Sequence, residues 1–593
     1  MKAFPTAAGI GLFALSCVVL ASPADEEFEN LAAGFIDDLP KFSQVNATAL
    51  GDHRYDHLLD QIDDAGRGRK LKLYRRYRTD LNAIDWDDLS RANKVDAELL
   101  GAEVESNIWS IETLQEWAWN PLIYVNLAGS SLYSLMARDF AALDQRIEDA
   151  VARLEQFPRF LRQTRESLQP SRVPRIHAET AIQQNKGIHS IVESMILPHR
   201  DQLSAELAAR LDASIATAEQ ALEEHQGWLE EELLPSAAGE FRIGARLFDE
   251  KLRLTLSSPL SRREIRLRAE SEYVAVRNEM YAIAREVYAE THPYTSFPDR
   301  PDDAFKQVVI RAALEEAYRD LPEPDAIVDI ARDYLQQATD FVRENNLVTV
   351  PADPIDIIVM PEFQRGVAVA YLDPPGALEE GQKSFYVVAP LPEDWSPEQV
   401  NSFLREYNLW SIQNLTLHEA MPGHYLQLAL SNRYPSPLRA ILWSGPFVEG
   451  WGVYAERIMI EAGYLDNAPL MRLINLKWYL RTVTNAIIDQ AIHVDGMTRE
   501  AAMKLMIEGG FQEEREAAGK WVRAQLSSTQ LSTYFVGYQE HVDMRKAVEH
   551  AWGDDFTLRR YHDQALSYGS PPVKFVRALM LDEEIPGAPG KSD

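Results

Sequence analysis

Cysteine is almost absent from this chain of 593 residues. The single cysteine, Cys17, lies within the first two dozen residues, a segment that we expect to be removed. The rest of the chain has no thiol, which excludes disulfide bonds, cysteine-ligated zinc and a cysteine nucleophile.

Positive charge is also scarce. The chain has 60 Lys and Arg residues against 91 Asp and Glu residues, which gives a formal net charge of -31. A surface this acidic repels phosphate backbones, so we expect no nucleic-acid partner. The excess of acidic residues mainly favours solubility and modestly favours cationic substrates.

Long apolar runs are absent after the first two dozen residues, so we expect no stable membrane insertion. Residues 1–24 begin with a positive charge, continue with an apolar run from Ala7 to Leu20, and offer small-residue cleavage sites at Ala21 and Ala24. This pattern is typical of a secretory signal peptide. A lipoprotein signal has leucine three residues before its cysteine, and Ala14 stands there instead. The sequence predicts a soluble protein that is exported to the periplasm or secreted.

Helical periodicity dominates the sequence from residue 25 to residue 346. Apolar side chains recur there at helical spacing, as in the stripe formed by Leu207, Leu211 and Ile215. We interpret these stripes as core packing. The region is predicted to be a helical N-terminal part of the protein.

The pattern changes in residues 347–593. Three short segments there are rich in β-branched or aromatic residues and predict a small sheet: Asp356–Met360, Gly366–Tyr371 and Ser384–Val388. Helical patterning resumes at Pro397. The predicted fold is therefore mainly α, with a large helical body and one small β-sheet.

One short segment carries the clearest chemical signal. Residues 415–427 read LTLHEAMPGHYLQ, which begins like the zinc-peptidase motif H-E-x-x-H but places the second histidine two residues late. Histidines six residues apart on a regular helix point roughly 120° apart and lie about 9 Å apart along its axis. The intervening Pro-Gly pair favours a break in the helix. We predict a distortion at Met421–Gly423 that lets His418 and His424 converge on a metal ion.

A third ligand candidate follows in the segment GPFVEGWG. Glu449 lies 25 residues after His424, in apolar and small-residue surroundings that disfavour an uncompensated charge. Two neutral imidazoles and one carboxylate, with a fourth position open, form the ligand set of a catalytic zinc site. Glu456 lies on the same helical face as Glu449. It is the alternative ligand, or a hydrogen-bonding partner of a ligating histidine.

The paired segments HEAMPGHYLQ and FVEGWGVYAE resemble the signature of a bacterial family called domain of unknown function 885. Weaker similarities cover most of the remaining chain, including Ala49–Asp56, Ile488–His493 and Tyr534–Gly537. That family in turn resembles helical zinc peptidases such as thimet oligopeptidase and carboxypeptidase Taq. The resemblance implies a zinc-peptidase-like helical body around a deep channel, with the small sheet near the cleft. The insertion at Met421-Pro422 departs from the peptidase pattern.

Glu419 directly follows the first histidine, so it projects beside the metal ion and not onto it. As in other zinc hydrolases with the H-E pair, it would act as general base on a zinc-activated water and then protonate the leaving amine. By analogy with the related peptidases, Tyr534 is the candidate donor to the oxyanion.

Four further residues are candidates for substrate binding. Tyr538 lies one helical turn after Tyr534, and Arg545 offers a charge for the C-terminal carboxylate of a peptide. His493 lies four residues after Asp489, a spacing that suits a hydrogen-bonded pair or a second metal ion. Tyr386 lies in Ser384–Val387, whose edge is predicted to pair with an extended peptide.

The leading hypothesis from the sequence is an exported zinc-dependent metallopeptidase that hydrolyses short peptides. A zinc hydrolase of another amide or ester is a second hypothesis, because the same water chemistry serves both reactions. A catalytically silent helical binding protein is the third. The intact His418, Glu419 and His424 argue against this silent alternative.

Overall fold

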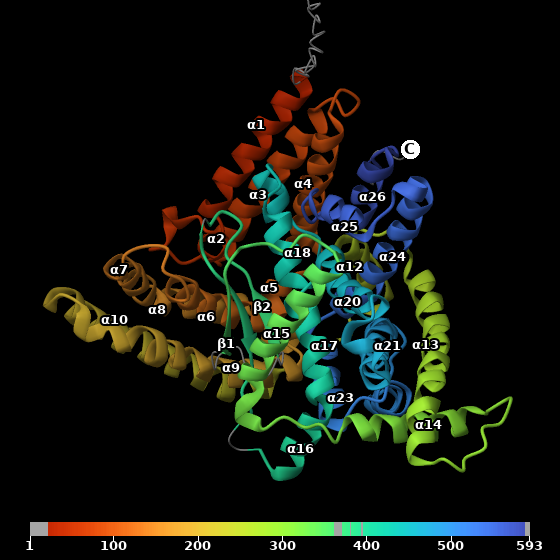
Figure 1. The fold of residues 1–593 in the computed structure, drawn as a ribbon. Helices are drawn as coiled ribbons and strands as arrows, with labels where there is room; N and C mark the ends of the chain where they lie inside the picture. The colour runs from red at the N-terminus through yellow and green to blue at the C-terminus, as the bar shows by residue number, and fades with distance from the viewer. Residues whose placement is uncertain (1–21, 361–369, 380, 393–394, 588–593) are drawn as a thin grey trace, which may run out of the picture.

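The computed structural model describes residues 22–360, 370–379, 381–392 and 395–587, which form a helical body with one small sheet (Figure 1). The predicted mainly α fold with a small sheet is confirmed. Most of the predicted signal peptide, and part of the strand predicted at Gly366–Tyr371, lie outside the described residues.

Fifteen α-helices precede the sheet in the described chain. They are α1 (Pro23–Asp38), α2 (Gln44–Leu50), α3 (Asp64–Ala83), α4 (Arg91–Trp109), α5 (Glu116–Trp119), α6 (Leu122–Met136), α7 (Leu143–Leu154), α8 (Phe157–Ser167), α9 (Arg175–Ile191), α10 (Ala205–Trp228), α11 (Leu234–Ser236), α12 (Gly244–Leu256), α13 (Arg262–Thr291), α14 (Asp303–Ala317) and α15 (Ile327–Glu344). The predicted stripe of Leu207, Leu211 and Ile215 lies in α10, where all three side chains are buried.

The sheet has three strands: β1 (Ile355–Val359), β2 (Ala370–Asp373) and β3 (Ser384–Val388). Their order in space is β1-β3-β2, with β1 parallel and β2 antiparallel to β3. The prediction that Ser384–Val387 forms an edge is therefore wrong. The last strand in the sequence inserts between the first two, so both of its sides already have partners and cannot pair with a peptide.

The α-helices after the sheet are α16 (Pro397–Glu406), α17 (Leu409–Glu419), α18 (His424–Ser431), α19 (Pro437–Ile441), α20 (Gly445–Glu461), α21 (Pro469–His493), α22 (Arg499–Lys504), α23 (Glu514–Leu526), α24 (Thr533–Trp552), α25 (Leu558–Leu566) and α26 (Val573–Leu581). Tyr464 packs against Phe341 of α15 and accepts a hydrogen bond from Gln413 of α17. Within the described ranges, no helix is both long and apolar enough to cross a membrane.

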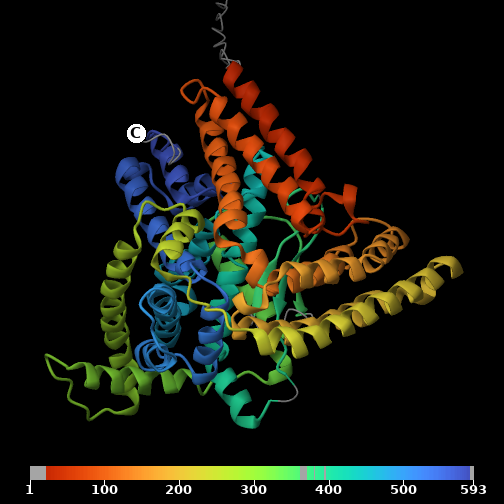
Figure 2. The ribbon, with the colours of Figure 1, turned by 180° about the vertical axis from the view of Figure 1, so that it is seen from behind.

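The largest group of packed, buried apolar side chains runs from Phe248 to Met580. It joins α12–α15 to the sheet and to the helices after it. A second group, between Val45 and Leu233, fills the helices that extend to one side of the molecule (Figure 2). The apolar core thus continues across residue 346, where the texture of the sequence changes. The division at this residue stays a prediction.

Helices α20 and α24 touch through their backbones. Gly450 of α20 lies against Gly537 of α24, and a Cβ atom on either glycine would overlap the backbone of the opposite helix. Next to this contact, the Nε2 atom of His541 lies 2.9 Å from the carbonyl oxygen of Phe447. The absence of side chains at the two glycines is what lets the helices approach this closely.

We expect Gly537→Ala to lower the free energy of unfolding by about 2 kcal/mol or more, because the added methyl group forces the two backbones apart. The measurement is denaturant unfolding followed by circular dichroism. Gly519→Ala is the matched control, since Gly519 lies inside α23 with nothing near its Cβ position. That control is expected to be stabilising by up to about 1 kcal/mol. Equal effects of the two substitutions would contradict the close contact.

Candidate metal centre

The candidate metal centre lies where α17 gives way to α18. Helix α17 ends at Glu419, the chain leaves helical geometry at Ala420, and α18 begins at His424. The amides of Ala420 and Met421 both donate to the carbonyl oxygen of Thr416, at 3.0 and 3.1 Å. The helix distortion predicted from the Pro-Gly pair is therefore confirmed.

Two close contacts hold the break in place. Gly423 lies against the carbonyl group of His418, and a Cβ atom at residue 423 would overlap it. The indole N–H of Trp451, in α20, donates to the carbonyl oxygen of Pro422 at 2.9 Å. The side chain of Trp451 is fully buried. Helix α20 is thereby attached to the five-residue segment that separates the two histidines.

The break brings the predicted ligands together. The rings of His418 and His424 lie 4.6 Å apart between centroids and are nearly perpendicular, at 83°. The Oε2 atom of Glu449 lies 3.9 Å from Nε2 of His418 and 3.6 Å from Nε2 of His424. One nitrogen or oxygen atom from each of the three residues falls within 4.8 Å of the other two.

This donor set fits a zinc ion. Nitrogen and oxygen ligands bind zinc at about 2.0–2.2 Å, which places the ligand atoms of a tetrahedral site roughly 3.3 Å apart. The distances of 3.6 and 3.9 Å to Glu449 are slightly longer than this separation. Two imidazoles and one carboxylate leave a fourth position of a tetrahedron open, as a catalytic site requires.

Glu456 is a hydrogen-bonding partner of a candidate ligand, which is one of the two roles predicted for it. Its Oε1 atom lies 2.7 Å from Nδ1 of His418, and its Oε2 atom accepts from Asn414 at 2.7 Å. Asn475 in turn donates to Asn414 at 2.9 Å. A carboxylate on Nδ1 orients the imidazole and leaves Nε2 for an ion. Nδ1 of His424 has no such partner among the described residues.

The contact of Gly452 with the ring of His418 was not predicted from the sequence. A Cβ atom at this position would lie 2.6 Å from Cε1 of His418, so α20 rests directly on the imidazole ring. The sequence offered a signal, because Gly450 and Gly452 flank Trp451 inside a helix, where glycine is otherwise unfavourable.

The electrostatics of the centre favour a cation. Burial acts to lower the pKa of His418, but Glu449 and Glu456 outweigh it and hold this pKa well above its usual range. Burial acts to raise the pKa of Glu449, but the two histidines hold it well below its usual range. The group contains two imidazoles and three carboxylates, including Glu419, and so attracts positive charge.

Glu419 lies beside His418, His424 and Glu449, the candidate ligand set, and is 7% exposed. Burial raises its pKa, and Glu449 adds to the effect, while the two histidines and a hydrogen bond from the backbone of Leu372 oppose it. Leu372 belongs to β2, so this strand contacts the carboxylate. Tyr386 of β3 is buried, and burial and Glu419 raise the pKa of its phenol.

Tyr534 lies in the first turn of α24, the helix that packs on α20. Its hydroxyl oxygen accepts from Arg523 at 2.9 Å and from Gln530 at 3.4 Å. Tyr534 acts to raise the pKa of Arg523, and Glu449 raises it further, so the guanidinium group is within electrostatic range of the ligand set. Arg523 carries no motif, and only the folded chain reveals its position.

Three predicted substrate-binding residues have other contacts in the structure. Nε2 of His493 lies 2.8 Å from the carbonyl oxygens of both Ala524 and Ser527, and no metal-binding group in the described chain includes it. The ring of Tyr538 packs on Tyr479.

Arg545 pairs with Glu461 at 2.8 Å. It lies eleven residues after Tyr534, which is roughly 16 Å along α24. These contacts give His493, Tyr538 and Arg545 structural partners and do not place them with the ligand set.

The fold and the two-histidine, one-carboxylate centre define a class of mainly helical proteins with a potential metal site. Residues 45–580 match a family described as "Bacterial protein of unknown function (DUF885)", and the chain belongs to this family. This match agrees with the resemblance seen in the paired motifs.

Two solved structures are similar to the chain. A "putative lipoprotein of unknown function" from Shewanella oneidensis is 34% identical, covers 93% of this chain and 99% of its own, and has a TM-score of 0.78. A "putative lipoprotein" from Colwellia psychrerythraea is 19% identical, covers 95% and 100%, has a TM-score of 0.76 and shares the fold. No curated protein matches the chain.

We expect Glu456→Ala to lower the free energy of unfolding by about 2–4 kcal/mol in metal-free buffer, because it leaves His418 and Asn414 buried without their partner. Denaturant unfolding in EDTA measures the change. Glu461→Ala on the same helix removes an exposed ion pair with Arg545 and is expected to cost at most about 1 kcal/mol. Similar costs for both substitutions would argue against the orienting role of Glu456.

Proposed function

We propose that the protein is an exported zinc-dependent metallopeptidase that hydrolyses short peptides. The observation that carries this proposal is the convergence of His418, His424 and Glu449 across a helix break, with Glu419 directly beside them. This arrangement combines the ligand composition of a catalytic zinc site with a carboxylate that is free to move protons.

His418, His424 and Glu449 would hold the ion. When bound, zinc supplies an activated water molecule and polarises the scissile carbonyl group. Glu419 would accept the proton of the attacking water and deliver it to the leaving amine. The hydrogen bond from the backbone of Leu372 orients the Glu419 carboxylate for this transfer.

Tyr534 is the proposed donor to the oxyanion. Arg523 and Gln530 both donate to its hydroxyl oxygen, so the hydroxyl proton remains free to point at a substrate. A phenol held in this way can stabilise the negative charge that develops on the carbonyl oxygen.

Peptides are the favoured substrate class because a strand edge borders the centre. Among the described strands β2 pairs only with β3, and the backbone of Leu372 is hydrogen-bonded to Glu419. An extended peptide can be aligned by backbone hydrogen bonds along such an edge. A zinc hydrolase of another amide or ester is the alternative, since the proton transfers would be the same.

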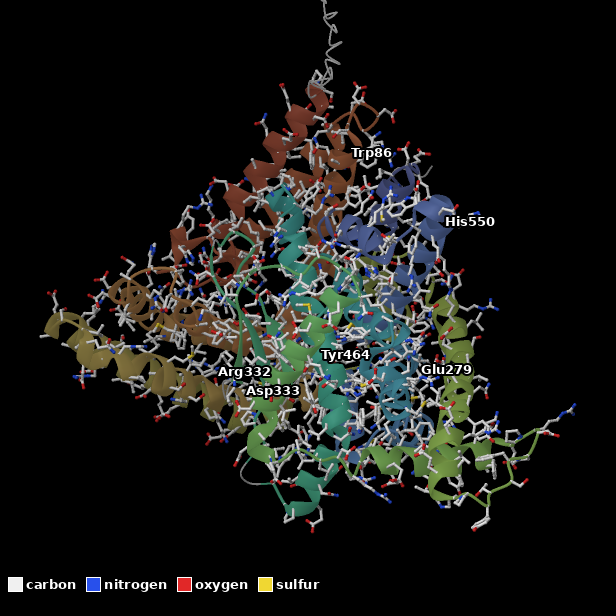
Figure 3. All side chains as sticks on the ribbon, in the orientation of Figure 1. Trp86, Glu279, Arg332, Asp333, Tyr464 and His550 are labelled. Carbon is white, nitrogen blue, oxygen red and sulfur yellow. The ribbon has the colours of Figure 1, made fainter. Side chains whose placement is uncertain are left out.

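Purified protein is expected to contain about one zinc ion per chain, as measured by elemental analysis after gel filtration. His424→Ala removes a ligand and is expected to abolish stoichiometric zinc. His550→Ala is the matched control, because His550 lies exposed near the end of α24 (Figure 3) and is expected to leave the zinc content unchanged.

Glu419→Gln completes this test. It should retain zinc but lower the rate of cleavage of a mixed peptide library by about 10²–10⁴-fold, because the general base is lost. Mass spectrometry of the products gives the comparison. Wild-type protein without bound zinc would contradict the metal site. Identical product profiles for wild type and Glu419→Gln would contradict the mechanism.

Export bears on where the mature chain begins. Ser22 caps α1: its hydroxyl group accepts from the amide of Asp25 at 2.9 Å. The carboxylate of Asp25 accepts from the amide of Ser90 at 2.9 Å and from Asn93 at 2.7 Å. Cleavage after Ala24 would remove the cap, whereas cleavage after Ala21 preserves it.

We therefore expect the exported protein to begin at Ser22. Intact-mass measurement on protein from the periplasm or medium checks this, since the two cleavage sites give masses that differ by three residues. A chain that begins at Asp25 would contradict the capping argument. A lipid attached to Cys17 would contradict cleavage by an ordinary signal peptidase.

A further inference from the structure

Four charged side chains form a cluster on α21 and α23. Glu516 pairs with Arg481 at 2.6 Å and with Lys520 at 3.7 Å, and it also accepts from the hydroxyl group of Tyr407 at 3.1 Å. Arg523 is the fourth member. Three basic side chains share one carboxylate, so the cluster has an excess of basic groups.

The neighbouring carboxylates form their direct ion pairs with other cations. Glu406 pairs with Lys477 at 2.8 Å. Glu513 lies 3.3 Å from Arg405, which also pairs with Glu315. Among the residues that the structure describes, none provides a carboxylate within 4.0 Å of Arg523. Glu516 is therefore the carboxylate that the described residues pair directly with the cluster, and it pairs with Arg481 and Lys520 but not with Arg523.

Burial makes this excess charge unfavourable. Lys520 is 4% exposed, and burial together with Arg481 lowers its pKa well below the usual range. Cations removed from water in this way need a partner of opposite charge. An anionic ligand would supply it.

The guanidinium group of Arg523 has unused hydrogen-bond donors. Its Nη2 atom donates to Gln530 and to the hydroxyl group of Tyr534, both at 2.9 Å. Its Nε and Nη1 atoms have no hydrogen-bond partner within the described part of the chain. The planar fork of a guanidinium group matches the two oxygens of a carboxylate.

Arg523 links the cluster to the candidate metal centre. Arg523 is bonded to Tyr534, which lies one helical turn before the contact of Gly537 with Gly450, and Gly450 follows Glu449 directly. Arg523 also interacts electrostatically with both Glu449 and Arg481. It therefore connects the positive cluster to the ligand set.

We propose that Arg523, supported by Lys520 and Arg481, binds a carboxylate group of the substrate beside the metal centre. This inference rests on the proposed peptidase function and specifies its substrate class as peptides with a carboxylate close to the scissile bond. The C-terminus of a short peptide and an acidic side chain both supply this group. Arg523 thus takes the role predicted for Arg545, whose charge is paired with Glu461.

Three versions of one short peptide, chosen from the cleaved members of the library, separate the two sources. The first has a free C-terminus, the second has a C-terminal amide, and the third has the amide plus a glutamate at its last position. Wild-type protein should cleave the free acid with a kcat/KM at least about tenfold above that of the amide. If kcat/KM for the third peptide returns to that of the free acid, the subsite accepts acidic side chains. Equal rates for all three would overturn the proposal.

Arg523→Gln and Arg523→Ala test the residue itself. Both should remove the preference for the free acid over the amide, while the zinc content stays near wild type. Arg523→Gln keeps hydrogen-bonding groups for Gln530 and Tyr534, so it separates loss of charge from loss of packing. Arg545→Ala is the matched control and should keep the wild-type preference. A wild-type preference in both Arg523 variants would overturn the proposal.

A binding measurement separates this inference from the peptidase proposal. N-acetylglycine should raise the melting temperature of wild-type protein, N-acetylglycinamide should not, and neither should stabilise Arg523→Gln. If zinc-loaded protein cleaves no peptide but still shows this difference, the peptidase proposal fails and the anion subsite stands. If peptides are cleaved but N-acetylglycine stabilises wild type and Arg523→Gln equally, the subsite fails alone.

Discussion

The contact between Gly423 and the carbonyl group of His418 is the constraint on which the centre depends. It lets the chain fold back immediately after α17, so that two histidines six residues apart can face each other. A side chain at residue 423 would push the second histidine away. The hydrogen bond from Trp451 to the carbonyl oxygen of Pro422 then attaches this turn to α20. A local backbone feature and a long-range contact together define the ligand geometry.

Helix α20 contributes to the centre along most of its length. Glu449 supplies the carboxylate, Trp451 holds the break, Gly452 makes room for the imidazole of His418, and Glu456 orients it. Glu449, Gly452 and Glu456 are three, four and seven positions apart and share one face of the helix, whereas Trp451 lies on another side. The chain is therefore bent between α17 and α18, while α20, which packs against the bend, is a regular helix.

Local chemistry made much of this predictable from the sequence. Proline and glycine between His418 and His424 indicated the break, and a carboxylate among apolar residues indicated Glu449. The β-branched segments indicated the sheet. Long-range pairing was not predictable in the same way. The position of β3 between β1 and β2, the pairing of Arg545 with Glu461, and the approach of Arg523 to Tyr534 all depend on contacts between distant segments.

The glycine contact between α20 and α24 has a mechanical consequence. With the two backbones touching at Gly450 and Gly537, neither a water layer nor a side chain separates the helices, so Glu449 and Tyr534 behave as parts of one rigid body. The contact between the helices therefore fixes the spacing between Glu449 and Tyr534.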